Sequence, residues 1–401
     1  ICACLVGSEM CIRDRYYNFS GCGNTLNCNH PVVQQLILEC LRYWTIEYHV
    51  DGFRFDLASI LGRNEDGSPA SQPPLLKNLA EDPILRNVKL IAEAWDAGGL
   101  YQVGSFPAFS RWAEWNGKYR DDMRSFLKGD FWYAKAAASR LTGSLDLYSG
   151  QYRGYASSIN FLTCHDGFSL WDLYSYNGKH NEDNGWNNTD GHDDNRSWNC
   201  GAEGETEDPE ICRLRLKMMK NACVSLMCSR GTPMFLAGDE FGDTRFGNNN
   251  PYCQDNEISW LDWKRLDTNK ELYLFFKKMI WFRRRHPVIR SNQKPSDTGF
   301  PAVSVHTNRP WDSMINQDTK GLAICYAGKT NQREDLVYVA FNVYWEGQTF
   351  ELPKLPEMYE WRCFADTALD GIEEECKKAA IQEYWLKPRS VAVFVAHRKK
   401  Q

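Results

Sequence analysis

Four apolar segments of this 401-residue chain each end in acidic side chains, which can act as nucleophiles, acids or bases. The acidic residues are Asp56, Glu93, Asp166 and the pair Asp239 and Glu240. Two such groups suffice to cleave a glycosidic bond, since one carboxylate attacks the sugar while a protonated carboxyl releases the leaving oxygen. Barrel enzymes place catalytic groups at the carboxyl ends of their strands. The pattern therefore predicts a glycoside hydrolase whose acidic set is Asp56, Glu93 and Asp166.

The residues around Asp56 and Glu93 favour different roles for the two carboxyl groups. Side chains two apart on a strand point to the same side, so the Arg54 guanidinium should lie beside Asp56 and keep it ionised, as a nucleophile requires. Glu93 ends an apolar strand and precedes Ala94 and Trp95. Such surroundings disfavour the charged form and should raise the pKa of Glu93, as a general acid requires.

His165 and Asp166 follow a third apolar segment. They offer a donor and an acceptor to sugar hydroxyls, and Asp166 could balance the positive charge that develops in the transition state. We expect these two residues to orient the substrate and stabilise the transition state.

Taken singly, these residues have more ordinary interpretations. An Asp at a strand end often caps a helix or forms a turn, and Arg54 with Asp56 could be an ordinary ion pair. His165 alone would more often be a buried imidazole, and Trp95 a core residue. The run 190–195 is more typical of a solvated loop than of a metal site. The hypothesis of a hydrolase depends on the residues occurring together.

The hydrophobic pattern predicts the elements that position these groups. Apolar residues recur at helical spacing over 31–48, with Asn29 as the expected N-cap, and a short strand over 50–56 follows. Further strands are expected over 88–95, 158–164 and 233–238, and further helices over 120–129, 134–140, 213–229 and 271–285. The polar segment 181–209 should be a surface loop. Asp56 and Glu93 are about one β/α repeat apart, and Glu93 and Asp166 about two, so the three can meet at one barrel mouth.

The composition is that of a globular chain, with 43% hydrophobic and 13% aromatic residues. A net charge of −5 and a pI near 6.0 come with no basic stripe, so nucleic acid is not an expected partner. No apolar run reaches the roughly 18 to 20 residues that span a bilayer, so a membrane is not expected either. The 15 cysteines are an odd number without paired or zinc-type spacing, which favours free thiols over disulfides.

Three parts are expected along the chain. Residues 1–15 lack periodicity and are interpreted as a non-native or irregular segment. Residues 16–300 carry the barrel elements. Short alternating segments at 322–326, 336–341 and 390–396 predict a small all-β domain over 301–401.

The segments around the acidic residues resemble the α-amylase family. Segment 52–56 resembles its nucleophile strand, segment 92–95 its acid strand, and segment 163–166 its third motif, in the same order. A narrower resemblance, to isoamylase-type debranching enzymes, lies in segments 17–25, 115–121, 197–201, 238–240 and 247–250. By this resemblance Asp56 is the nucleophile, Glu93 the acid/base and Asp166 the stabiliser of the transition state. The implied substrate contacts are Arg54, His165 and Trp95.

The implied fold is a partial (β/α)8 barrel followed by a small all-β sandwich domain. The implied reaction is hydrolysis of α-1,6 linkages in branched α-glucans such as amylopectin, glycogen or phytoglycogen, with no cofactor and no metal. Homo-oligomers, or hetero-oligomers with other isoamylase subunits, are further expectations. The compartment would be a plastid for a plant or algal source and the cytoplasm for a bacterial one.

One departure from the family bears on function. In the family, Asp56 would end the fourth barrel strand, Glu93 the fifth and Asp166 the seventh, so the first three strands and an N-terminal β-sandwich would precede residue 16. A barrel without those strands has exposed sheet edges. The alternatives are therefore an inactive fragment of the enzyme and a non-catalytic glucan-binding or regulatory subunit. An α-1,4-cleaving amylase or a glucan transferase would share the acidic set, and only the debranching motifs argue against them.

Overall fold

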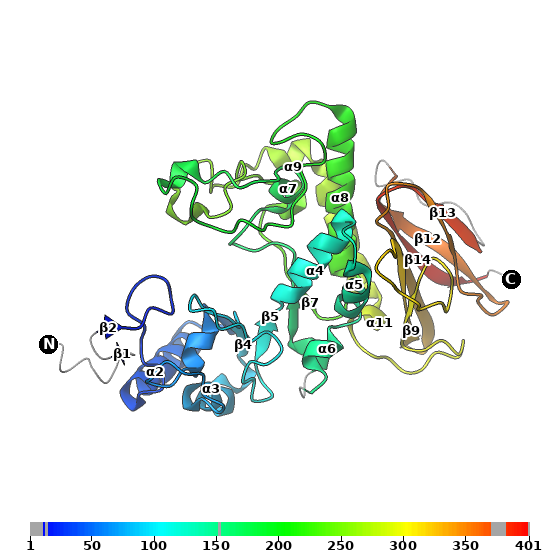
Figure 1. Ribbon diagram of the computed structural model, residues 1–401. Helices are drawn as coiled ribbons and strands as arrows, with labels where there is room; N and C mark the ends of the chain where they lie inside the picture. Colours follow the sequence, from blue (N-terminus) through cyan, green and yellow to red (C-terminus); the bar gives the residue numbers. More distant parts are fainter. Residues whose placement is uncertain (1–10, 13–14, 151–153, 370–381, 400–401) are drawn as a thin grey trace. The chain divides into compact units, whose positions relative to one another are not determined.

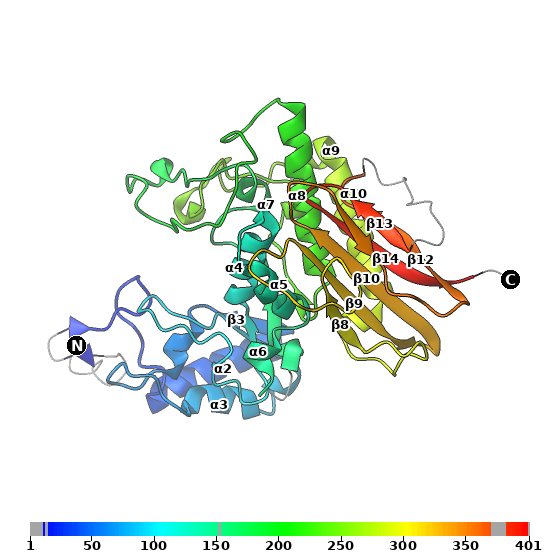
Figure 2. The same cartoon turned by 45° about the vertical axis from the view of Figure 1, so that its right-hand side comes forward.

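The computed structural model describes residues 11–12, 15–150, 154–369 and 382–399. The chain divides into two compact units, the first made of residues 1–117 and 144–159 and the second of residues 118–143 and 160–401 (Figures 1 and 2). Within the described ranges, no helix is both long and apolar enough to cross a bilayer. The expectation for residues 1–15 lies largely outside the described residues. Of that segment the structure shows only its part in a short antiparallel ladder of β1 (Cys11–Ile12) and β2 (Arg15–Tyr16).

A parallel sheet organises the first unit and confirms the sheet expected of a β/α barrel. Its strands pair in the order β3 (Gly52–Phe55), β4 (Lys89–Ala92), β5 (Ala113–Trp115) and β6 (Ser158–Asn160). Phe55 pairs with Ala92, so Asp56 and Glu93, which follow these two residues, leave the sheet at the same edge. Strand β5 is not among the expected strands, because three residues are too few to show an alternating pattern.

The helix that precedes β3 is α2 (Pro31–Glu47), close to the expected range. The prediction of Asn29 as its N-cap is wrong, since the N-cap is His30 and no side chain caps the helix. Asn29 instead donates hydrogen bonds to the carbonyl oxygens of Leu61 and Arg63 at 3.1 and 2.8 Å. Its amide group thus satisfies the backbone of a neighbouring segment, a competing role open to any Asn near a helix end.

The core of the first unit lies between the sheet and α3 (Pro74–Glu81). Leu75, Leu76 and Leu79 of α3 are fully buried in one cluster with Leu90 and Ala92 of β4. The remaining elements of this unit are η1 (Ala58–Gly62), α3 (Pro74–Glu81), η2 (Leu85–Asn87), α6 (Leu145–Tyr148) and η3 (Gly154–Ser157).

Asn160, the last residue of β6, belongs to the second unit, where its carbonyl oxygen accepts a hydrogen bond of 2.8 Å from the Met234 N–H. Strand β7 (Thr232–Pro233) is much shorter than the expected strand over 233–238. The Leu236 N–H donates to the carboxylate of Asp239 at 3.1 Å, so it is not free to extend a ladder. A local side-chain bond therefore ends the strand early.

Two long helices pack together in the second unit, close to where helices were expected. α8 (Pro209–Met227) begins at Asp208, whose carboxylate caps the N–H groups of Glu210 and Ile211 at 2.8 and 3.3 Å. α10 (Lys270–Arg285) packs against α8.

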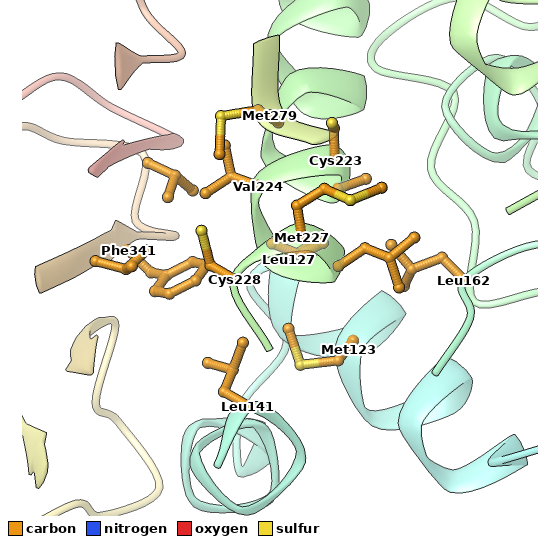
Figure 3. Close-up of a cluster of buried hydrophobic side chains, with 14 of the residues drawn as sticks. Met123, Leu127, Leu141, Leu162, Cys223, Val224, Met227, Cys228, Met279 and Phe341 are labelled. Carbon is orange, nitrogen blue, oxygen red and sulfur yellow. The ribbon is translucent and has the colours of Figure 1, made fainter. Parts of the chain in front are cut away.

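The apolar side chains of these helices form the main core of the second unit. Figure 3 shows Val224 and Met227 of α8 beside Met279 of α10, in a cluster that also contains Leu127 and Phe341. The other helical elements of the unit are α4 (Gly117–Lys128), α5 (Tyr133–Leu141), α7 (Leu170–Leu173), η4 (Glu182–Asn184), η5 (Asp239–Phe241), η6 (Pro251–Cys253), α9 (Arg265–Thr268) and α11 (Pro287–Arg290).

The end of the chain forms the expected antiparallel β domain. Its larger sheet has the strand order β12-β14-β10-β9-β8, and β11 pairs with β13 in a second, two-stranded sheet. Phe350 of β11 and Leu386 of β13 are buried in one cluster with Tyr338 and Phe394 of the larger sheet, as in a sandwich. The strands are β8 (Val303–His306), β9 (Gly321–Thr330), β10 (Arg333–Asn342), β11 (Gln348–Glu351), β12 (Tyr359–Asp366), β13 (Glu383–Leu386) and β14 (Ser390–Arg398).

The cysteines depart from expectation at one position. Cys363, in β12, is disulfide-bonded, so the expectation that disulfides would be absent is wrong there. Free thiols are found among the described residues at Cys22, Cys28, Cys40, Cys164, Cys200, Cys212, Cys223, Cys228, Cys253 and Cys325.

Met279 offers a test of the core between α8 and α10, because its side chain is fully buried. We expect Met279→Ala to lower the free energy of unfolding of the second unit by about 2–5 kcal/mol, through lost burial and a residual cavity. The matched control is Met314→Ala, since Met314 is 84% exposed and the same change should cost less than about 0.5 kcal/mol. Denaturant unfolding of both variants measures this, and equal effects would contradict the packing described.

Candidate active site

Arg54 lies between the two carboxyl groups that follow β3 and β4. Its Nη1 is 2.5 Å from Oδ1 of Asp56, and its Nη2 is 2.8 Å from Oε1 of Glu93. One guanidinium therefore pairs with both carboxyl groups and keeps them close to each other, as the two carboxyl groups of a glycosidase must be. The predicted pairing of Arg54 with Asp56 is confirmed. The pairing of Arg54 with Glu93 was not predicted, because it joins residues on different strands.

The two carboxyl groups differ sharply in exposure. The side chain of Asp56 is 71% exposed, whereas that of Glu93 is 5% exposed. Oε2 of Glu93 accepts a hydrogen bond of 2.8 Å from the N–H of Leu57, the residue after Asp56. Leu57 has φ = 41°, a left-handed conformation that costs energy for a residue with a side chain and is found mainly at constrained functional turns. The buried Glu93 thus holds the turn that leaves Asp56 accessible.

Burial and the Arg54 guanidinium act on Glu93 in opposite directions. Burial favours its neutral form, while the adjacent positive charge favours its charged form. The raised pKa expected for Glu93 therefore stays a prediction.

Aromatic rings lie beside this cluster. The guanidinium carbon of Arg54 is 4.2 Å from the ring centroid of Trp115, which belongs to β5. Trp95 is half-buried and stacks on Tyr101, with ring centroids 6.0 Å apart and planes 11° from parallel. Trp115 was missed as a site residue because β5 was not predicted. Its position directly before Asn116 and Gly117, in a segment already noted as a motif, was the available signal.

His165 and Asp166 lie together in the second unit. Their side chains are about half exposed, at 51% and 60%, and His165 Nε2 is 3.6 Å from Asp166 Oδ2. The backbone of this turn is held on both sides, since Arg245 Nη1 donates to the His165 carbonyl at 2.7 Å and the Gly167 N–H donates to the Asn249 carbonyl at 2.9 Å. The two side chains are therefore accessible on a fixed turn.

A buried carboxylate anchors both ends of the segment that carries this turn. Asp239, at 1% exposure, accepts hydrogen bonds from Thr163 Oγ1 before the turn and from the Leu170 N–H after it, the latter at 2.8 Å. Asp239 was noted in the sequence as one of the acids at a strand end. In the structure its oxygens bind the protein itself, so it positions the turn and is not available to substrate.

Asp172, two residues after Leu170 in α7, acts in a similar way. Its buried carboxylate accepts hydrogen bonds from Thr244 Oγ1 and from the Arg245 N–H, the latter at 2.9 Å. Burial raises the pKa of Asp172 and of Asp239 to about 6, despite these hydrogen bonds. Asp172 thus fixes the segment whose Arg245 holds His165, while Asp239 fixes the segment that carries His165 itself. Sequence reasoning missed both roles, because nothing in the local pattern distinguishes a buried anchor from an exposed acid.

The structure thus brings Arg54, Asp56 and Glu93 together in the first unit, and His165 and Asp166 together in the second. The catalytic roles of these residues, the substrate contact by Trp95 and the meeting of Asp166 with Asp56 and Glu93 stay predictions. Among the residues that the structure describes, no group of three or more His, Cys, Asp or Glu side chains is arranged to hold a metal ion.

Comparison with known families and sequences gives consistent matches. The model of the alpha amylase catalytic domain matches residues 12–303. Isoamylase 3, chloroplastic, from Oryza sativa subsp. japonica is 48% identical over 355 residues, which are 88% of this chain and 44% of that protein. A glycogen operon protein GlgX homolog from Mycobacterium tuberculosis is 45% identical over 373 residues, 88% of this chain and 51% of that protein. The chain spans about half the length of the relatives it matches.

Solved structures support the fold. Pullulanase from Bacillus acidopullulyticus superposes with a TM-score of 0.70 at 21% identity, over 95% of this chain and 42% of that chain. Pullulanase from Anoxybacillus, complexed with maltotetraose, has a TM-score of 0.69 at 20% identity, over 97% of this chain and 50% of that chain.

The anchoring role of Asp239 predicts a pH dependence of stability. Its pKa is raised from 3.8 to about 6 by burial, so between these pH values the folded protein keeps a proton that the unfolded chain has lost. This group therefore makes the protein less stable as pH rises from about 4 to about 6. Asp239→Asn removes the titration, so the stability of the variant relative to wild type should rise over that window by on the order of 1–3 kcal/mol.

Unfolding free energies of wild type and Asp239→Asn, measured in denaturant at several pH values from 4 to 7, test this. Asp318→Asn changes an exposed carboxylate, so its unfolding free energy should depend on pH in the same way as that of the wild type. Parallel curves for Asp239→Asn would contradict the role assigned to burial.

Proposed function

Because this chain belongs to the family of the alpha amylase catalytic domain, we propose that it is an isoamylase-type retaining glycoside hydrolase. The bonds cleaved would be α-1,6-glucosidic branch linkages in amylopectin, glycogen or related α-glucans. The observation that carries the proposal is the single guanidinium of Arg54, which pairs with an exposed Asp56 and a buried Glu93. An accessible carboxylate and a buried carboxyl with the same counter-ion are the parts that a double-displacement glycosidase needs.

In the first step, Asp56 attacks the anomeric carbon while Glu93 gives its proton to the departing glycosidic oxygen. Asp56 suits this role because it is exposed and its charge is stabilised by Arg54. In the second step, water attacks the glycosyl ester, Glu93 takes the proton from that water, and Asp56 is released. Asp166 would stabilise the positive charge on the sugar, and His165 and Trp95 would contact the sugar at the cleavage point.

The shared guanidinium would keep the charges of the site near balance through both steps. While Glu93 holds its proton, Arg54 balances the charge of Asp56. Once Asp56 is esterified and Glu93 has lost its proton, the same guanidinium lies 2.8 Å from the new carboxylate. One negative charge therefore moves between two partners of one cation, which avoids an unpaired charge at the buried position.

The choice of α-1,6 linkages rests on the relatives, among them isoamylases from rice and from maize, the latter 44% identical over 384 residues. The names of the rice and maize proteins place them in the chloroplast. For this chain we propose a plastid if its source is a plant or alga and the cytoplasm if it is a bacterium. Association with further copies or with other isoamylase subunits is also part of the proposal.

Asp56→Asn tests the nucleophile. We expect the release of reducing ends from amylopectin to fall by at least about a thousandfold, because an amide cannot form the glycosyl ester. Asp51→Asn, an exposed acid just before the same strand, should retain wild-type rates. Circular dichroism and thermal unfolding establish that both variants fold. Activity retained by Asp56→Asn would show that the nucleophile lies elsewhere.

A comparison of substrates tests the linkage. Wild-type protein should release linear chains from amylopectin and glycogen, whereas unbranched amylose should yield no new reducing ends. Chromatography of the chains after each incubation makes the distinction. Cleavage of amylose would identify an α-1,4-acting enzyme. A folded protein that releases nothing from amylopectin, glycogen or amylose would contradict the proposal of a hydrolase.

A further inference from the structure

Two exposed aromatic side chains of the second unit, far apart in the sequence, are joined by a hydrogen bond at the surface. Trp186 is 55% exposed and Tyr252 is 68% exposed. The indole N–H of Trp186 donates a hydrogen bond of 3.0 Å to the hydroxyl oxygen of Tyr252. The two residues, which we call the aromatic platform, are therefore held beside each other although 66 positions separate them.

Hydrogen bonds made by amide side chains connect the two segments and fix the aromatic platform. Asn184, two residues before Trp186, donates to the Asn250 carbonyl at 2.9 Å and accepts from the Gln254 amide at 2.8 Å. Asn250 and Gln254 flank Tyr252 on either side. The segment 181–209, expected to be a surface loop, is thus anchored by side chains that sequence reasoning did not single out. Its exposed aromatic residue is presented on a rigid base.

The same network reaches the turn that carries Asp166. The carbonyl oxygen of Asn249 accepts a hydrogen bond of 2.9 Å from the Gly167 N–H. Asn249 is also bonded twice to Asn181: its side-chain oxygen accepts from the Asn181 amide, and its own N–H donates to the Asn181 side-chain oxygen, both at 2.9 Å. Asn181 lies three residues before Asn184. The aromatic platform and the Asp166 turn are accordingly parts of one hydrogen-bonded structure within the second unit.

The chemistry of the platform selects a neutral, ring-shaped ligand. Two large aromatic side chains left in water gain free energy when an apolar surface covers them, and the flat faces of sugar rings are such surfaces. The exposed charged side chains of the two segments are acidic at Glu182, Asp183 and Asp255. These would repel nucleic acids, phosphates and other anions. A neutral oligosaccharide is compatible with both the rings and the charges.

We propose that the aromatic platform formed by Trp186 and Tyr252 binds a chain of the α-glucan substrate by stacking on its sugar rings. This inference rests on the proposed function for the identity of the ligand. It adds a glucan-binding surface to the second unit, connected through Asn249 to the Asp166 turn.

Binding of maltohexaose to the wild-type chain and its variants, measured by titration calorimetry, tests the proposal without requiring hydrolysis. We expect Trp186→Ala and Tyr252→Ala each to raise the dissociation constant about fivefold, as the loss of one aromatic stacking partner does. Tyr252→Phe keeps the ring and loses the bond to Trp186, so a smaller rise of about twofold is expected. Trp345→Ala is the matched control, because Trp345 is similarly exposed, at 58%, in the C-terminal β domain.

Each outcome bears on one proposal. The proposed binding surface is overturned if Trp186→Ala and Tyr252→Ala bind maltohexaose with wild-type affinity and have unchanged melting temperatures. It is also overturned if the wild-type chain does not bind maltohexaose. An equal loss in Trp345→Ala overturns it too, since the effect would then be general. If the variants weaken binding as expected while the wild-type chain releases nothing from amylopectin, the platform stands and the proposed hydrolase function fails.

Discussion

The bridge that Arg54 makes between Asp56 and Glu93 is the interaction on which the rest of the first unit depends. A guanidinium holds its N–H donors in a fixed planar fork, so Nη1 and Nη2 can pair with two different carboxyl groups only if both are brought to the right places. The parallel pairing of β3 with β4 does this, because Phe55 and Ala92 are partners and the next residue of each strand carries a carboxyl group. The bond from the Leu57 N–H to Glu93 then closes the turn. Arg54 is a counter-ion for a carboxyl group that is buried, and removing one partner of a buried charge pair costs several kcal/mol.

In the second unit, too, an exposed pair of side chains is held in place, but here the holding carboxylate is a separate buried residue. There the exposed pair His165 and Asp166 is held by two buried residues, Asp239 and Asn249, and by the partly buried Arg245. Asp239 binds both ends of the segment, Arg245 holds the His165 carbonyl, and Asn249 accepts the Gly167 N–H. Burying Asp239 raises its pKa to about 6, so this positioning is obtained at some cost in stability near neutral pH. Stability given up at anchoring residues is common where an exposed turn must be held in one conformation.

Each unit therefore carries a part of the acidic set on a locally fixed turn. The match to the alpha amylase catalytic domain includes residues of both units. The chain corresponds to about half of the relatives that it matches, while the family model extends over residues 12–303 and the antiparallel domain begins at Val303. The glycosidase chemistry that we propose is compatible with this division, since a nucleophile and an acid must be close to each other while further substrate contacts can come from other segments. The amide network under Trp186 and Tyr252 belongs to the second of these parts.

The sequence by itself determined Asp56 and Glu93 as acids that directly follow strands, the long helices α2, α8 and α10, the strands β9, β10 and β14 of the C-terminal domain and the pairing of Arg54 with Asp56. Each of these depends on periodicity or on neighbours in the chain. The tertiary structure decided what depends on residues far apart: the second partner of Arg54, the position of Trp115 on the unpredicted strand β5, the disulfide at Cys363, and which strand-end acids face solvent. Asp56 and Asp239 look alike in sequence, yet one is exposed and the other buried with three donors. The physical reason is that burial and long-range hydrogen bonds are properties of packed surfaces, and no local pattern of residue types encodes them.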